Sequence, residues 1–259
     1  MILEGKTLIV TGVGPGLGSE IVRCALRDGA NVMLAARTEA KLKAMAERLD
    51  PDGRRVAYQA TDITDESQCA ALTAATLDRF GAIDALANVA ALDNSFGDTL
   101  GTDAETWRSC LEVNVVGLAT LVKAVASEMK NRGGGSIVLI GSQSSELPGP
   151  PQVAYASSKG AAMTAMKFFA TDLGPHKIRV NTVIPTWMWG PPVQGYVQST
   201  AETRGISEAE VVSEITANMP LGEIPKDDDV AEAVVFFCSD RASAITGQSL
   251  LVNAGEWMP

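Results

Sequence analysis

The sequence predicts an α/β fold: a doubly wound, seven-stranded parallel sheet in a single domain that spans residues 1–259. Short apolar runs alternate along the chain with longer amphipathic stretches, which is the pattern of repeated β-α-β units. Several of these runs are apolar throughout, as is typical of strands that helices cover on both faces. No repeat, linker or low-complexity segment divides the chain into parts.

The predicted strands follow one another with helices between them, and they cover residues 6–10, 30–36, 56–60, 84–89, 136–140, 178–184 and 249–252. Start signals support the helices: Thr64 precedes the helix predicted at 66–80, and Ser207-x-x-Glu210 has the form of a capping box. The stretch 185–206 is irregular and shows neither a strand pattern nor a clear helix. We expect it to be an elaborated loop that forms a lid over the substrate, because long loops in compact domains tend to be functional.

The charge and composition of the chain argue against several classes of partner and site. A net charge of -10 and a pI near 4.7 argue against a nucleic-acid partner, because nucleic-acid binders need a concentrated basic face. No run approaches the ~18 apolar residues of a membrane span, so no membrane partner is expected. The four cysteines are scattered without a CxxC pair, which favours a reducing cytoplasm. With one histidine, His176, the chain has no clustered histidine site, and we predict no metal.

The first predicted strand runs directly into the glycine-rich turn TGVGPGLG, residues 11–18, and a helix follows. Glycines permit positive φ angles and a close approach of the backbone to a phosphate, while the helix N-terminus supplies free N–H groups. The spacing Gly12-x3-Gly16-x-Gly18 is neither GxGxxG nor a Walker loop. A plain tight turn is the alternative, but the position inside a β-α-β unit favours dinucleotide binding.

The segment after the second strand selects the dinucleotide. Folds that prefer NAD place an acidic residue there, whereas an arginine accommodates the 2′-phosphate of NADP. Here Arg37 follows Ala36 and the nearest acid, Glu39, falls in the next helix, so NADP is favoured over NAD. The alternative for Arg37 is an ordinary solvated charge. Asp62, just past the third strand, can accept a hydrogen bond from an adenine amine or cap the next turn.

A helix predicted at 152–173 carries a phenol, Tyr155, and an ammonium, Lys159, on the stripe that faces the core. A lysine there needs a partner or a water-lined cleft; a snorkelling lysine beside a packed tyrosine is the alternative. An ammonium within about 4 to 6 Å lowers the pKa of a phenol, so Tyr155 is a candidate general acid/base. The stripe continues through Ala162, Met166, Phe169 and Leu173.

Two further polar residues belong to this constellation. Ser142 follows the fifth strand, at the carboxyl edge where open parallel sheets bind ligands, although a turn serine would look the same. Asn114 lies inside a predicted helix with the apolar stripe Leu111, Val115, Leu118, Val122 and Val125. Asparagine is a mediocre helix residue, so Asn114 either holds a water or is merely tolerated.

In order and spacing, TGxxxGxG at 11–18, Asn88 after the fourth strand, Asn114, Ser142 and Tyr155-x3-Lys159 resemble the short-chain dehydrogenase/reductase family over nearly the whole chain. The resemblance implies a Rossmann-type fold and a homotetramer. It implies that Tyr155 donates or accepts the proton, Ser142 orients the substrate oxygen, Lys159 binds the nicotinamide ribose and lowers the pKa of the tyrosine, and Asn114 holds a relay water. The nucleotide site it implies comprises Gly12, Gly14, Gly16, Leu17, Gly18, Arg37, Asp62, Ile63, Asn88, Tyr155, Lys159, Pro185 and Thr186.

The chain also departs from the family pattern. The common NNAG is ANVA, PG after the sixth strand is PT, and Pro15 stands where many NADP-preferring members have a basic residue, which weakens the NADP prediction. We expect an apolar substrate pocket, because two tryptophans and a methionine form an adaptable wall; packing beneath the lid is the alternative. The predicted pocket residues are Gln143, Ser144, Leu147, Val153, Trp187, Met188 and Trp189.

The sequence therefore predicts an NAD(P)-dependent oxidoreductase that acts on a hydrophobic secondary alcohol or ketone. The alternative is a non-catalytic dinucleotide-binding protein of the same fold, which would not need Ser142, Tyr155, Lys159 and Asn114 together. A serine hydrolase is disfavoured, since the chain has neither GxSxG nor a well-placed histidine.

Overall fold

Seven parallel strands form one sheet in the order β3-β2-β1-β4-β5-β6-β7. The protein is described by a computed structural model that covers residues 1–259. The strands are β1 (Thr7–Thr11), β2 (Asn31–Ala36), β3 (Val56–Ala60), β4 (Ala85–Asn88), β5 (Gly135–Ile140), β6 (Ile178–Pro185) and β7 (Ser249–Val252). The seven strands and their parallel pairing confirm the fold class predicted from the apolar runs.

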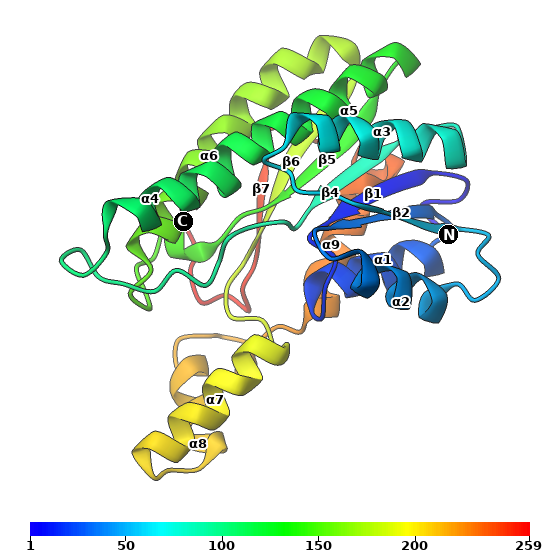
Figure 1. Ribbon diagram of the computed structural model, residues 1–259. Coiled ribbons are helices and arrows are strands. Elements are labelled where there is room, and N and C mark those ends of the chain that lie inside the picture. Colours follow the sequence, from blue (N-terminus) through cyan, green and yellow to red (C-terminus); the bar gives the residue numbers. More distant parts are fainter.

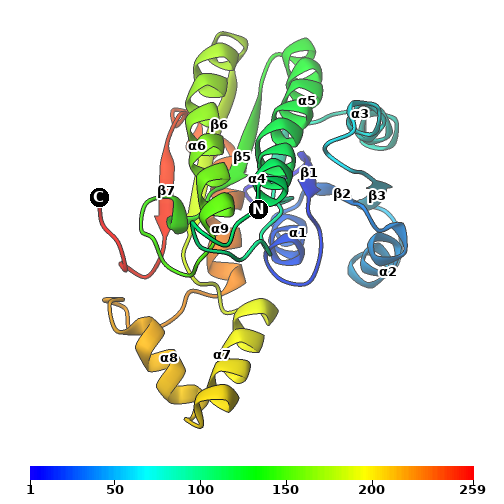
Figure 2. The ribbon, with the colours of Figure 1, turned by 60° about the vertical axis from the view of Figure 1, so that its left-hand side comes forward.

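Helices cover both faces of the sheet (Figure 1). On one face lie α1 (Leu17–Arg27), α2 (Glu39–Leu49) and α9 (Asp227–Cys238), and on the other lie α3 (Glu66–Phe80), α4 (Ala104–Leu111), α5 (Leu118–Arg132) and α6 (Val153–Leu173). The smaller helices α7 (Pro191–Arg204) and α8 (Glu208–Thr216) project beyond the edge where the strands end (Figure 2).

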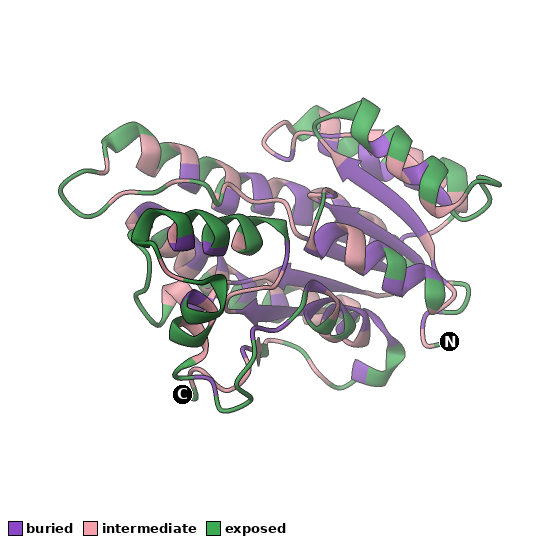
Figure 3. Cartoon of the chain, turned by 90° about the horizontal axis from the view of Figure 1, so that it is seen from below, coloured by how far each residue is buried: buried purple, intermediate pink, exposed green.

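The strands separate two hydrophobic cores, because successive side chains of a strand point to opposite faces. In β1, Leu8 and Val10 join the core beneath α1 and α9, whereas Ile9 joins the core beneath α3, α5 and α6. All three are fully buried, which explains why the run is apolar without alternation. The burial map shows the central strands of the sheet buried and the outer faces of the helices exposed (Figure 3). The edge strands β3 and β7 are only partly covered.

A π-helical segment, Glu112–Gly117, joins α4 to α5 and corrects the helical stripe predicted around Asn114. A π turn holds an extra residue, so the faces before and after it are out of register with an ideal α-helix. Leu111 is consequently exposed and Val115 only partly buried, while Asn114 is buried at 4% exposure. The predicted stripe holds only from Leu118 onward.

The stretch 185–206 is not the loop that the sequence predicted. Most of it is helix α7, which packs against α8 (Figure 2). A small core of Val197, Ala201 and Val211 lies between the two helices. Pro191 and Pro192 begin this helix, because proline is well tolerated in the first turn, whose N–H groups have no partner within the helix. The segment still lies over the carboxyl ends of the strands (Figure 1).

Cap residues were predicted with mixed success. The capping box of Ser207 and Glu210 is present as expected. The cap of α3, however, is Asp65 rather than Thr64, since the Asp65 carboxylate accepts hydrogen bonds from the backbone N–H groups of Ser67 and Gln68.

One stretch of helix, Ala104–Arg132, is long and apolar enough to cross a membrane by length and composition alone. Core helices of globular proteins pass the same test, and this stretch packs between α3 and α6 against the sheet (Figure 2). Its apolar side chains are therefore explained by the core that they help to form.

Candidate active site

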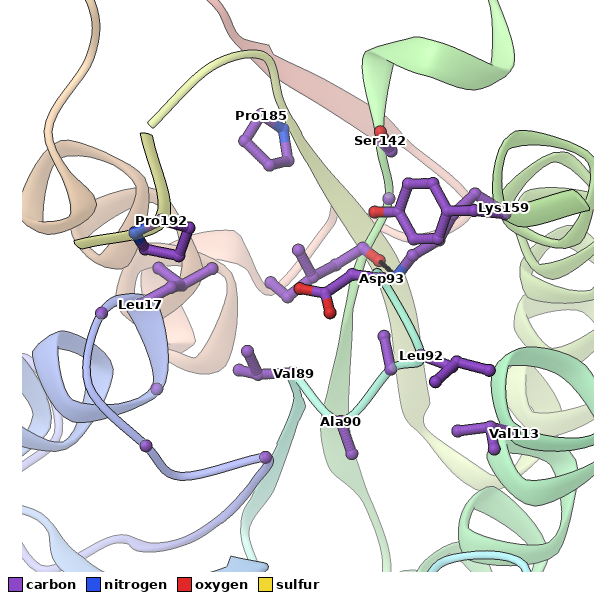
Figure 4. A pocket seen from close by; sticks show the side chains of 18 of the residues that line it. Leu17, Val89, Ala90, Leu92, Asp93, Val113, Ser142, Lys159, Pro185 and Pro192 are labelled. Carbon is purple, nitrogen blue, oxygen red and sulfur yellow. Dashed lines mark hydrogen bonds between the residues drawn. The ribbon is translucent and has the colours of Figure 1, made fainter. Parts of the chain in front are cut away.

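A cavity of about 1490 Å³ opens along the carboxyl ends of the strands. It lies between the neighbouring strands β1 and β4, where the strand order reverses, which is where doubly wound sheets bind ligands. Figure 4 shows Val89 and Ala90 at its base, Leu17 on one side, and Ser142 and Lys159 on the other. The predicted residues that line it are Gly12, Gly14, Gly16, Leu17, Gly18, Arg37, Asp62, Ile63, Ser142, Gln143, Ser144, Leu147, Tyr155, Lys159, Pro185, Thr186, Trp187 and Met188.

The glycine-rich turn has the geometry of a phosphate cradle. Gly12 has φ +69°, and a Cβ there would lie 2.4 Å from the backbone N of Ala90. Gly16 has φ +103° and precedes α1, which has no side-chain cap at its N-terminus. The first N–H groups of α1 therefore face the cavity without a capping side chain, as an anion such as a pyrophosphate requires.

At the far end of the cavity, the segments after β2 and β3 supply the polar groups. Arg37 is exposed and makes no salt bridge, and Thr38 and Lys41 line the cavity beside it. Asp62 accepts hydrogen bonds at Oδ1 from the backbone N of Thr64 and from its hydroxyl. Asp62 thus caps a turn, one of its two predicted roles, and it also lines the cavity.

The cavity fits an extended dinucleotide. Small residues line its middle, where a pyrophosphate would approach the backbone, and cationic side chains line one end. Tyr155 lines the same cavity beside Ser142 and Lys159. A nicotinamide nucleotide would be held by the glycine turn, by Lys159, and by Pro185 and Thr186 after β6.

Tyr155, Lys159 and Ser142 come together in this cavity, as the sequence predicted. Lys159 is buried, at 6% exposure, and donates a 2.8 Å hydrogen bond from Nζ to the carbonyl oxygen of Ile140. It lies 5.7 Å from the centre of the Tyr155 ring. Ser142 Oγ hydrogen-bonds Tyr155 and lies 2.8 Å from Ser144 Oγ.

The pKa of the Tyr155 phenol contradicts the sequence analysis. Burial raises it to about 12, and the hydrogen bond with Ser142 opposes that rise without cancelling it. The negative charge of Asp93 raises the pKa of the phenol further. The fold by itself therefore keeps Tyr155 protonated at neutral pH, as a proton donor must be.

Burial also lowers the pKa of Lys159 to about 8, with a smaller opposing effect of Asp93. Between about pH 8 and 10.5, this lysine is protonated in the unfolded chain and neutral in the fold, so its contribution to stability rises with pH. The free energy of unfolding of wild type minus that of Lys159→Met should therefore rise by up to about 3 kcal/mol across this range. Denaturant titrations at several pH values measure it. For Lys167→Met, an exposed lysine of the same helix, the difference should stay constant; a constant difference for Lys159→Met would contradict the assignment.

Asn114 and Asn88 do not line the main cavity. The amide of Asn114 accepts a hydrogen bond from the backbone N of Leu92, and donates to the carbonyl of Leu92 and to Ser158 Oγ. The predicted water-holding amide is thus committed to fixing the segment after β4. Asn88 accepts a 2.6 Å hydrogen bond from Thr11 Oγ1 and ties β4 to β1 beneath the glycine turn.

Two predicted pocket residues are also absent from the cavity wall. Trp189 packs against the small core between α7 and α8, because the backbone turns there and alternate side chains face opposite ways. Val153 lies at the start of α6 outside the cavity, where its backbone N bonds the carbonyl of Gly97. Only Trp187 and Met188 of the predicted wall therefore face the substrate space.

Sequence reasoning missed several lining residues. Asp93 carries a charge that affects both Tyr155 and Lys159, and Glu256 near the C-terminus also lines the cavity. Lys41, four residues after Arg37 on an exposed face of α2, could have been found from that spacing. No local pattern marks Asp93 or Glu256, because both reach the cavity only through the tertiary fold.

Comparison with known proteins identifies relatives along nearly the whole chain. A family model described as enoyl-(acyl carrier protein) reductase matches residues 12–256. L-rhamnose 1-dehydrogenase (NAD(P)(+)) of Azotobacter vinelandii is 32% identical over 260 residues, which cover 98% of each chain. L-fucose dehydrogenase of Mus musculus is 32% identical over 252 residues, 97% of this chain and 88% of that one. Among solved structures, a variant of actinorhodin polyketide ketoreductase with NADPH superposes with a TM-score of 0.88 at 29% identity, covering 97% of each chain.

Proposed function

Because the chain belongs to the short-chain dehydrogenase/reductase family, we propose that it transfers a hydride between an NAD(P) nicotinamide and a hydrophobic secondary alcohol or ketone. The observation that carries this proposal is the meeting of Ser142, Tyr155 and Lys159 in the cavity that the glycine-rich turn also lines. A non-catalytic dinucleotide-binding protein would have no use for a protonated phenol held in this way.

The roles of the side chains follow from their positions. A bound nicotinamide nucleotide would supply or accept the hydride. Ser142 Oγ holds the substrate oxygen in reach of Tyr155, and the Tyr155 hydroxyl gives its proton to that oxygen during reduction or takes it back during oxidation. The Lys159 ammonium, fixed by the carbonyl of Ile140, places positive charge beside the phenol and binds the ribose.

The raised pKa of Tyr155 favours carbonyl reduction at neutral pH, because the phenol is then already in the donor form. Oxidation needs the phenolate, so its rate should rise with pH. The neighbouring positive charges of Lys159 and of an oxidised nicotinamide would assist that ionisation.

We further propose that NADP is preferred to NAD, on the support of Arg37 and Lys41 beside one another at the end of the cavity. Arg37→Ala should weaken NADPH binding by roughly 10- to 100-fold, the effect of losing a charged hydrogen bond, and leave NADH binding nearly unchanged. Fluorescence titrations with both nucleotides measure this. Arg48→Ala, exposed in the last turn of helix α2, which follows Arg37, is the control. Equal losses for NADPH and NADH would contradict the preference.

The substrate would pack against Trp187, Met188 and Leu147. The Trp187 ring lies 5.2 Å from that of Tyr196 on α7, so the lid and the pocket wall are in direct contact. Apolar and aromatic walls of this kind suit a hydrophobic ring or chain.

Assembly and location remain part of the proposal. Exposed apolar side chains on the π-helical segment and on α6, among them Val116 and Phe168, would be covered in a homotetramer formed through paired helices. The four cysteines are free and buried, which is compatible with a cytoplasmic protein. We propose neither nucleic acid nor membrane as a partner.

The experiment that tests the function is a panel of secondary alcohols and ketones assayed with NADPH and NADH by the nicotinamide absorbance. The proposal expects turnover of apolar ketones with NADPH. Tight nucleotide binding without turnover of any panel member would instead favour the non-catalytic alternative.

A further inference from the structure

We propose that Glu256 is a specificity-determining residue that binds a hydroxyl group of the substrate, so that the preferred substrate is a ketone or alcohol carrying a second hydroxyl. This inference rests on the proposed function and names the substrate class of the same site. Neither the composition nor the sequence motifs point to it. It comes from the way in which the C-terminal segment is folded back into the cavity.

The Glu256 carboxylate is held by one of its two oxygens. Oε2 accepts a 2.7 Å hydrogen bond from Gln143 Nε2 and a second one from the hydroxyl of Thr186. No hydrogen bond within the chain reaches Oε1. Since Glu256 is half-buried and lines the cavity, a free acceptor is left facing the space for a ligand.

The two donors locate this acceptor relative to the reaction. Gln143 follows Ser142, which is bonded to Tyr155, and Thr186 follows β6 at the carboxyl edge of the sheet. Glu256 therefore bridges the two walls of the substrate space. Gln143 was predicted as a substrate contact, but both ends of its amide bond other residues of the chain. Nε2 donates to Glu256, and Oε1 accepts a 2.7 Å hydrogen bond from Asn253 Nδ2. Gln143 therefore acts as a positioning residue.

The backbone that carries Glu256 is also specially built. Ala254 has φ +51°, a left-handed conformation that is costly for a residue with a Cβ and persists only where the surroundings enforce it. Asn253 holds the turn, accepting at Oδ1 from the backbone N of Gly255 and at its carbonyl from the N of Glu256. The carbonyl of Ala254 accepts from the N of Leu221, which pins the tail to the segment after α8.

The ligand chemistry follows from the carboxylate. An ionised carboxylate only accepts hydrogen bonds, so its partner must carry an O–H or N–H donor. A hydroxyl can bond Oε1 and remain compatible with the apolar wall of Trp187 and Met188, because the rest of the substrate packs there. An apolar substrate would remove water from Glu256 Oε1 without replacing its hydrogen bond. That loss weakens the binding of substrates that lack the hydroxyl, so the site discriminates against them.

The test compares two ketones of matched size, 2-hydroxycyclohexanone and 2-methylcyclohexanone, with NADPH as the reductant. Wild type should show kcat/KM at least tenfold higher for the hydroxyketone, the effect of a hydrogen bond to a charged group. In Glu256→Gln and Glu256→Ala, the ratio of kcat/KM for the hydroxyketone to that for 2-methylcyclohexanone should fall by about tenfold. Most of this fall should come from a lower kcat/KM for the hydroxyketone. The ratio of the two values is independent of how much enzyme is folded.

Glu146→Gln is the matched control, because it removes an exposed carboxylate close in sequence to Gln143 that does not line the cavity; its ratio should match wild type. Reduction of both ketones by wild type at similar kcat/KM, or an unchanged ratio in the Glu256 variants, would overturn the inference while leaving the hydride transfer intact. A higher kcat/KM for 2-aminocyclohexanone than for the hydroxyketone would also overturn it, in favour of a cationic substrate. No NADPH oxidation with any ketone would instead overturn the proposed function, and the inference with it.

Discussion

Tyr155→Phe should lower kcat by about 10²- to 10⁴-fold, the usual contribution of a positioned general acid. The substitution removes one oxygen and leaves the ring, so the packing of α6 against the sheet is preserved. The dissociation constant for NADPH should change little, because the glycine turn, Arg37 and Lys159 are intact. Stopped-flow turnover and equilibrium nucleotide titrations measure the two quantities separately.

Tyr58→Phe is the matched control for this substitution, since Tyr58 lies on β3 outside the cavity. It should retain wild-type turnover. Equal kcat in Tyr155→Phe and wild type would rule out the phenol as the proton donor and leave Ser142 and water as candidates.

Gly12→Ala is expected to have the largest effect on stability and on nucleotide binding. The φ of +69° costs an alanine about 1–2 kcal/mol, and its Cβ would lie 2.4 Å from the N and 2.7 Å from the Cα of Ala90. Those atoms belong to the backbone after β4 and cannot move as a side-chain end can, so overpacking adds about 1–3 kcal/mol. The thermal midpoint should fall by roughly 5–15 °C.

Gly14→Ala, two residues along the same turn, provides the comparison. A Cβ at Gly14 meets no atom within 4 Å, and its φ is not in the left-handed region. The midpoint of this variant, measured without nucleotide, should stay within about 2 °C of wild type. Similar midpoints for the two variants would show that the close approach of Gly12 to Ala90 does not constrain the turn.

The sequence predicted the sheet well because its signal is local. Runs such as residues 137–140 are apolar on both faces, and every predicted strand overlaps an observed one to within one or two residues. The Tyr155 and Lys159 stripe was also accessible, since a helix of regular period fixes which side chains share a face. Ala162 and Met166 on that stripe are buried as expected.

The failures have physical causes that spacing does not encode. The π turn at Glu112–Gly117 shifted the face of Asn114 by a fraction of a turn, and its effect spread to Leu111 and Val115. Helix α7 lies within a stretch whose sequence shows no regular helical pattern, and it begins at two consecutive prolines. The pKa of Tyr155 depends on desolvation more than on the nearby ammonium, and desolvation is a property of the whole packed site.

The proposed role of Glu256 could not be predicted from the sequence either. The tail GEWMP carries no motif, and its carboxylate reaches Gln143 only after a left-handed turn at Ala254 that sequence alone does not predict.

The most direct test of the account is a crystal structure of the enzyme with a nicotinamide nucleotide and an unreactive alcohol or ketone. The account predicts the substrate oxygen within about 2.6–3.2 Å of both Tyr155 Oη and Ser142 Oγ, with the nucleotide extending past the glycine turn toward Arg37. A substrate oxygen out of reach of Tyr155, or a nucleotide bound elsewhere than along the glycine turn, would contradict it.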